Sequence, residues 1–245
     1  MNEFFKKPNI DYNLQLREKY DITAIACVSI TIGEKPEENL LLFLLFQSIA
    51  SVTNDYLHYY INELENKCDN DKTDSVPLLE RTFAYELYRQ WFNYIKAFGI
   101  TLRVDAEIGK KITNGKIDFQ KIKKLEGDYK EPDLVLHAYQ GNTENQTIIC
   151  EIKRSEQLDE TKIVNDIIKT CHFIDPQIWD GNPYKYGCFI VIHKTVEELS
   201  SMILNAKSRI EKEIKEKTLT PDMSHLLIIT YNGDSVKWDL LSNLL

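Results

Sequence analysis

The sequence TIICEIK at residues 147–153 decides the fold, because a run of apolar and β-branched residues ends there in two charged ones, Glu151 and Lys153. Such a run is typical of a buried β-strand. Side chains two positions apart in a strand project from the same face, so these two are expected to point the same way. Upstream, Pro132 and Asp133 open a second apolar run, LVL at 134–136. Asp133 is therefore expected at the mouth of a neighbouring strand, where it can join the pair.

This combination of charged residues points to a specific chemistry. Two carboxylates hold a hard divalent cation through oxygen, as Mg²⁺ requires. A lysine beside them can orient the attacking water or help to deprotonate it. Metal-assisted hydrolysis of a phosphodiester uses such a set, so the residues predict a nuclease.

Hydrophobic periodicity predicts the elements around these strands. Four-residue steps of apolar residues indicate a helix over 77–98, with Pro77 in its first turn and Gly99 at its C-terminal cap. Strands are predicted at 102–108, 133–139 and 146–153, the last two joined as a hairpin through a turn at 141–145. Further predictions are helices at 9–20, 37–67, 160–174 and 196–217, and strands at 22–32, 187–193 and 226–231. From residue 77 the order is α-β-β-β-α-β-α-β, which predicts an α/β (α+β) fold with a mixed sheet flanked by helices.

This order, together with PD at 132–133 and EIK at 151–153, resembles the PD-(D/E)XK nuclease superfamily with its restriction-endonuclease-like fold. The family core is α-β-β-β-α-β, and the resemblance covers roughly residues 77–193. It implies that Asp133, Glu151 and the backbone carbonyl of Ile152 bind Mg²⁺ or Mn²⁺, and that Lys153 positions the water. It also implies products with a 5′-phosphate and a 3′-hydroxyl.

The resemblance implies two further site residues on helices. Many family members carry a glutamate on the first core helix, near the metal and often through water, and Glu86 matches it here; otherwise Glu86 pairs with Arg89 or Gln90. A lysine on the helix after the third strand often contributes, which matches Lys169, with Asp166 as a weaker match. The alternative for Lys169 is a solvated helix position.

Charge distribution bears on the partner. A net charge of −8 weighs against a general nucleic-acid binder. The segment 109–130, however, holds seven lysines against three acidic residues and leads directly into Asp133. It is either a solvated loop or a segment that binds the phosphates of nucleic acid. The expected partner is nucleic acid, DNA more than RNA, and cutting both strands with one site per chain would favour a homodimer.

Length and composition bound the remaining possibilities. The 245 residues fit one compact unit, or an N-terminal extension over 1–76 followed by a nuclease-like domain over 77–245, with the polar segment 68–75 between them. Five widely spaced cysteines without a Cys-x-x-Cys pair, and an N-terminus without an apolar leader, predict a reduced, cytoplasmic protein. The apolar run at 40–46 is too short for a bilayer, so no membrane partner is expected.

Two other classes of protein stay open. The first is a catalytically inactive protein that keeps the PD-(D/E)XK fold and binds nucleic acid or protein. The second is an interaction protein whose helices at 37–67 and 196–217 mediate assembly, the motif being accidental. Binding of a divalent metal would separate both from the enzyme.

Overall fold

The protein is described here by a computed structural model that covers residues 2–6 (backbone only), 32, 35–53, 78–106, 132–138, 146–155, 158–179 and 182–245. Several sequence predictions fall outside these residues: the helix at 9–20, the strand up to residue 31, the helix beyond residue 53, the boundary segment 68–75, the lysine-rich segment 109–130 and the turn at 141–145.

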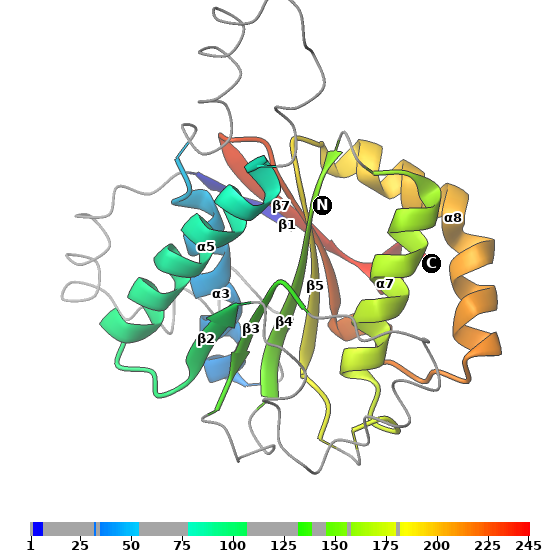
Figure 1. The fold of residues 1–245 in the computed structure, drawn as a ribbon, viewed down its shortest axis with the longest axis horizontal. Coiled ribbons are helices and arrows are strands. Elements are labelled where there is room, and N and C mark those ends of the chain that lie inside the picture. Colours follow the sequence, from blue (N-terminus) through cyan, green and yellow to red (C-terminus); the bar gives the residue numbers. More distant parts are fainter. Residues whose placement is uncertain are drawn as a thin grey trace, which may run out of the picture.

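A seven-stranded mixed sheet forms the centre of the fold (Figure 1). Its spatial order is β1-β7-β6-β5-β4-β3-β2. The three central strands β4, β5 and β6 are parallel, and the outer pairs on both sides are antiparallel. The strand bounds are Asn2–Lys6 for β1, Arg103–Ala106 for β2, Leu134–His137 for β3, Gln146–Arg154 for β4, Tyr186–Ile192 for β5, Leu226–Tyr231 for β6 and Ser235–Leu240 for β7.

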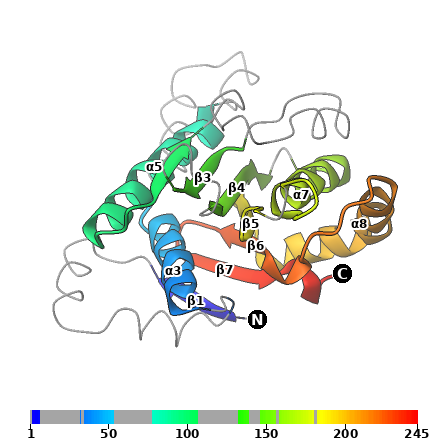
Figure 2. The same ribbon diagram turned by 90° about the horizontal axis from the view of Figure 1, so that it is seen from below.

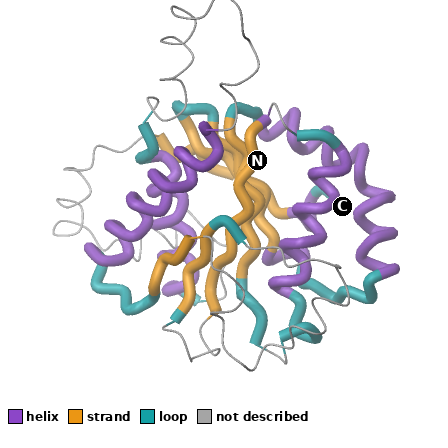
Figure 3. The backbone as a smooth tube through the Cα atoms, in the orientation of Figure 1, coloured by secondary structure: helices purple, strands orange, loops and turns teal. Residues whose placement is uncertain are grey.

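Helices cover both faces of the sheet (Figures 1 and 2). α3 (Pro36–Ala50) and α5 (Leu78–Ala97) lie on one side, and α7 (Glu160–Ile174) and α8 (Val196–Glu216) lie on the other. The tube in Figure 3 shows the same layering of helix, strand and helix. Each layer buries its own apolar cluster, one centred on Phe46 and Trp91 and the other on Ile167 and Phe189. The predicted fold class, a mixed sheet flanked by helices, is confirmed.

The alternation along β4 decides which face the charged residues occupy. Ile148, Cys150 and Ile152 belong to the cluster under α3 and α5. Ile149 belongs to the cluster under α7 and α8. Since successive side chains alternate between faces, Glu151 and Lys153 follow Ile149 onto the α7 face.

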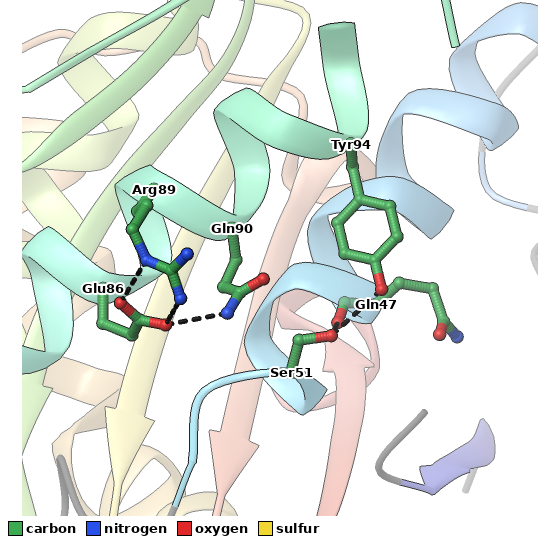
Figure 4. A network of polar contacts seen from close by, with 6 residues as sticks. All are labelled: Gln47, Ser51, Glu86, Arg89, Gln90 and Tyr94. Carbon is green, nitrogen blue, oxygen red and sulfur yellow. Dashed lines mark hydrogen bonds and ion pairs between the residues drawn. The ribbon is translucent and has the colours of Figure 1, made fainter. Parts of the chain in front are cut away.

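Most predicted elements agree with the structure to within two residues at each end, from α5 through β6. The helix predicted over 37–67 is wrong in length, because α3 ends at Ala50. Ser51 forms its C-terminal cap, and its hydroxyl bonds back to the Gln47 carbonyl and meets the Tyr94 hydroxyl (Figure 4). Serine and β-branched residues are weak helix formers, and the sequence Ser-Val-Thr at 51–53 ends the helix.

Two strands, β1 and β7, were not predicted from the sequence. The signal for β7 is the Asn-Gly pair at 232–233, where Gly233 adopts a φ of 96° and turns β6 back into β7. β1 then pairs with β7 at the edge of the sheet. The described parts of residues 1–76 thus join the same sheet and the same core as the rest of the chain.

Two further features concern the cysteines and the apolar character of the helices. Cys150, Cys171 and Cys188 are free and buried, as small residues of a hydrophobic core often are. None of the helices in the described part of the chain has the length and apolar character that a membrane crossing requires.

Candidate metal centre

The carboxyl end of β4 brings the motif residues together. β3 and β4 pair antiparallel with Leu134 opposite Cys150, so Asp133 enters the sheet beside the end of β4. The Ile152 backbone N–H donates a hydrogen bond to Asp133 Oδ2 at 2.6 Å. This bond fixes the Asp133 carboxylate next to the charged end of the motif strand.

Glu151 is the most deeply buried charged residue of the cluster, with no exposed surface. Its Oε1 forms an ion pair with Lys169 Nζ at 2.6 Å. Its Oε2 has no hydrogen-bond partner among the described residues. Burial raises the pKa of Glu151 to about 8; Lys169 acts to lower this pKa and Asp133 acts to raise it. A buried carboxylate oxygen without a donor is a place where a cation fits.

Lys153 lies on the same face as Glu151, as the sequence predicted. Its Nζ donates to the Ile152 carbonyl at 3.0 Å and lies 3.7 Å from Glu80 Oε1. Burial acts to lower the pKa of Lys153, but the carboxylates around it, with Asp166 the largest influence, hold that pKa above its ordinary value. Lys153 is therefore a protonated cation in the absence of substrate.

Helix α7 supplies the second lysine. Its N-terminus is capped by Asp159, whose side chain accepts a hydrogen bond from the Lys162 backbone. Lys169 then lies two and a half turns into the helix, buried against Glu151 rather than solvated. Asp166 lies about one turn before Lys169, and its negative charge acts to raise the pKa of Lys153. Both α7 residues suggested by the resemblance thus belong to the cluster.

Glu86 does not join this cluster, contrary to the sequence-based assignment. Both of its oxygens bind neighbours on its own helix: Arg89 Nε at 2.7 Å, Arg89 Nη2 at 2.5 Å and Gln90 Nε2 at 2.7 Å (Figure 4). None of its hydrogen bonds or ion pairs reaches Asp133, Glu151 or Lys153. The alternative weighed for Glu86, pairing with Arg89 or Gln90, is the one found.

Glu80, six residues earlier on α5, takes the place expected for Glu86. Burial raises the pKa of Glu80; Lys153 acts to lower it, Asp133 acts to raise it, and a hydrogen bond from the Arg154 backbone also lowers it. Glu80, Arg81, Tyr85 and Asp133 border a small pocket of about 20 Å³, which holds about one water molecule. The sequence carried only a weak signal, because Glu80 lies three residues before Phe83 and so borders the buried stripe of Phe83, Leu87 and Trp91.

Arg154 follows Lys153 on the opposite face of β4 and is buried. The Ile152 carbonyl, which the resemblance implies as a metal ligand, accepts a hydrogen bond from the Lys153 ammonium.

The donor set was tested for a metal by its chemistry. The described residues contain no group of three or more His, Cys, Asp or Glu side chains placed to hold a metal ion. Asp133 and Glu151 nevertheless lie near enough for the Asp133 charge to act on the pKa of Glu151, and one Glu151 oxygen is buried without a donor. Mg²⁺ commonly uses one or two carboxylates and keeps several waters, so these two residues fit it.

Comparisons with known proteins add no assignment. A scan against protein-family models, a search of curated proteins and a search of solved structures each found no match to this chain. The resemblance to the PD-(D/E)XK superfamily therefore stands on the motif and the order of elements alone.

Proposed function

We propose that this chain is a metal-dependent nuclease that hydrolyses phosphodiester bonds in nucleic acid, with DNA as the first substrate to test. The observation that carries the proposal is the convergence of Asp133, Glu151 and Lys153 at the end of β4, with one oxygen of the fully buried Glu151 left without a hydrogen-bond donor. Burying a carboxylate in this way is costly unless a cation or donors compensate it.

Each residue then has a role that its surroundings support. Asp133 and Glu151 would hold Mg²⁺ or Mn²⁺, which supplies charge neutralisation at the scissile phosphate and acidifies water. Lys153 carries a proton and lies among carboxylates, so it acts by orienting water and stabilising developing negative charge rather than as the free base. Glu80 accepts hydrogen bonds beside it. Lys169 neutralises Glu151 in the absence of metal.

The same ion pair favours a second candidate, an inactive PD-(D/E)XK-fold protein that binds nucleic acid or protein. Lys169 Nζ lies at hydrogen-bonding distance from the carboxylate that a metal would need. If that ammonium permanently takes the place of the metal ion, the chain keeps the fold and the cluster of charged residues but has no catalytic activity.

Cleavage assays separate the two candidates. Plasmid, linear and single-stranded DNA and RNA are incubated with Mg²⁺ or Mn²⁺ and wild type, Asp133→Asn or Lys153→Met. Lys212→Met serves as the control, because Lys212 is an exposed α8 residue remote from the motif strand. We expect metal-dependent cutting that both site variants lose and the control retains. Absence of cutting on every substrate, together with absence of Mg²⁺ binding in calorimetry, would support the inactive binding protein.

A further inference from the structure

One exposed face of α5 combines aromatic and basic side chains. At 100° per residue, six side chains fall within an arc of about 100°. They form what we call the α5 stripe: Arg81, Tyr85, Tyr88, Arg89, Phe92 and Lys96. Tyr85 is 55% exposed and Phe92 43% exposed. The buried face of the helix, with Phe83, Leu87 and Trp91, points the opposite way. Tyr88 is partly buried against that core, but core packing does not account for the exposed rings of Tyr85 and Phe92.

The rings and cations of the stripe contact one another. Tyr88 and Phe92 stack with their centroids 6.2 Å apart and an interplanar angle of 24°. Lys96 Nζ lies 5.9 Å from the centroid of the Phe92 ring. The Arg89 guanidinium is 57% exposed, yet it is held by two bonds to Glu86 (Figure 4). The network around Glu86 thus fixes a cation on the outer surface of the helix.

Charge along the stripe has one sign, in a chain whose net charge is −8. The two carboxylates of α5, Glu80 and Glu86, lie outside the arc. Arg89 is already paired with Glu86, but a partner that covered this face would also desolvate Lys96, which is unfavourable unless the partner supplies an anion. A polyanion with flat, apolar surfaces matches both parts of the stripe.

The stripe is continuous with the candidate metal centre. Arg81 and Tyr85 border the same small pocket as Glu80 and Asp133. From Arg81 to Lys96 the helix extends about 22 Å at 1.5 Å per residue. A strand that followed the stripe would therefore be led to the carboxylates at the end of β4.

We propose that the α5 stripe binds single-stranded nucleic acid, with bases stacked on its rings and phosphates paired with its cations. Every base has a π-face, so such stacking tolerates any sequence. In a duplex those faces are already stacked and closed to side chains, which favours a single strand. The inference rests on the proposed nuclease function for the fate of the strand, but binding is measured separately from cleavage.

Fluorescence anisotropy with labelled oligothymidylate, oligouridylate and a duplex, in chelator and without metal, tests the binding. The variants are Tyr85→Ala and Phe92→Ala, with Tyr85→Phe to keep the ring. Leu204→Ala is the matched control, because Leu204 is an apolar α8 residue that is also exposed, at 52%. We expect single strands to bind more tightly than the duplex. Loss of a stacked base should weaken binding by about fivefold or more per ring, while Tyr85→Phe and the control bind as wild type does.

Salt dependence tests the cationic part. Lys96→Gln should reduce the slope of log affinity against log salt by about 0.7, the value for one phosphate contact on a single strand. Lys212→Gln, which removes an exposed α8 lysine, should leave the slope unchanged. Thermal melting of each variant checks that the fold is retained.

Distinct results overturn the two proposals. Wild-type affinity in both ring variants, preference for the duplex, or absence of binding to every oligonucleotide would refute the stripe, even if the protein cuts DNA. Ring-dependent binding without metal-dependent cutting would leave the stripe standing and refute the nuclease. A difference between oligothymidylate and oligouridylate would identify which single strand the stripe prefers.

Discussion

At the scale of single residues, Glu80 and Glu86 show how the position of a side chain around one helix decides which neighbours it meets. The two positions differ by 600° around α5, or 240° after full turns, so they point to different sides. Glu80 reaches Lys153 across the end of the sheet, and Glu86 turns to Arg89 and Gln90. The sequence shows both glutamates, but the rotation of α5 about its axis relative to the sheet is set by packing in three dimensions.

Truncating each glutamate should therefore give opposite results. Glu80→Ala should lower metal-dependent cleavage about 10- to 100-fold, as loss of a group that orients the site does, with little change in stability. Glu86→Ala should leave the rate per folded molecule unchanged, while the buried Gln90 amide loses its acceptor at a cost of about 1–3 kcal/mol. Chemical denaturation and cleavage kinetics on both variants measure this. Equal losses of activity in the two would contradict the assignment.

Glu151 predicts a pH dependence of stability in metal-free buffer. Its pKa is raised from 4.5 to about 8 by burial, against the opposing effect of Lys169. The neutral carboxyl therefore stabilises the folded chain fully below pH 4.5, and that contribution is lost as the pH rises through 8. Melting temperatures in chelator should fall as the pH rises from 4.5 to about 8 in wild type and change less in Glu151→Gln. A Glu216→Gln control, on the exposed end of α8, should follow wild type.

At the scale of elements, long periodic segments were predictable and short or interrupted ones were not. α7 and α8 carry sustained amphipathic patterns and start at residues with capping side chains, Asp159 and Thr195. The end of α3 has a local signal in Ser-Val-Thr at 51–53, but the contact of the Ser51 hydroxyl with Tyr94 of another helix is one that no local pattern reveals. The candidate site was predictable from β4, because the apolar run of this strand ends in the charged residues Glu151 and Lys153. Lys169 was suggested by the family resemblance, whereas the position of Glu80 depends on how α5 packs against the sheet.

The contact between α7 and β5 makes a prediction of its own. Gly187 in β5 lies under α7, and a Cβ there would overlap the Cγ2 methyl of Thr170. Gly187→Ala should destabilise the fold by about 1–3 kcal/mol through this overlap. Thr170→Ser removes the methyl and keeps the hydroxyl that bonds the Asp166 carbonyl, so it should rescue Gly187→Ala. Denaturant titration of the single and double variants tests the coupling, and additive losses would contradict it.

At the scale of the whole molecule, the start of the chain supplies the edge strand of the sheet on one side. β1 pairs with β7, and the described contacts of α3 join the same core, so residues on both sides of the expected division at 76 build one sheet. Sequence alone could not reveal this, because the partner of β1 lies more than two hundred residues away. An unpaired edge strand is also a template for aggregation, and β1 covers the outer edge of β7.

Deleting residues 1–6 should expose that edge while leaving the centre of the sheet intact. The β7 amides that face β1 lose their acceptors, so their hydrogen exchange should accelerate, whereas the amides of β5, three strands from β1 in the sheet order, should exchange as in wild type. Phe5→Pro, which removes one backbone donor from β1 opposite Val236, should reproduce part of the effect. Exchange in β5 that accelerates equally would mean that β1 supports global stability instead of the edge. Unchanged exchange in β7 would mean that β1 does not pair with it in solution.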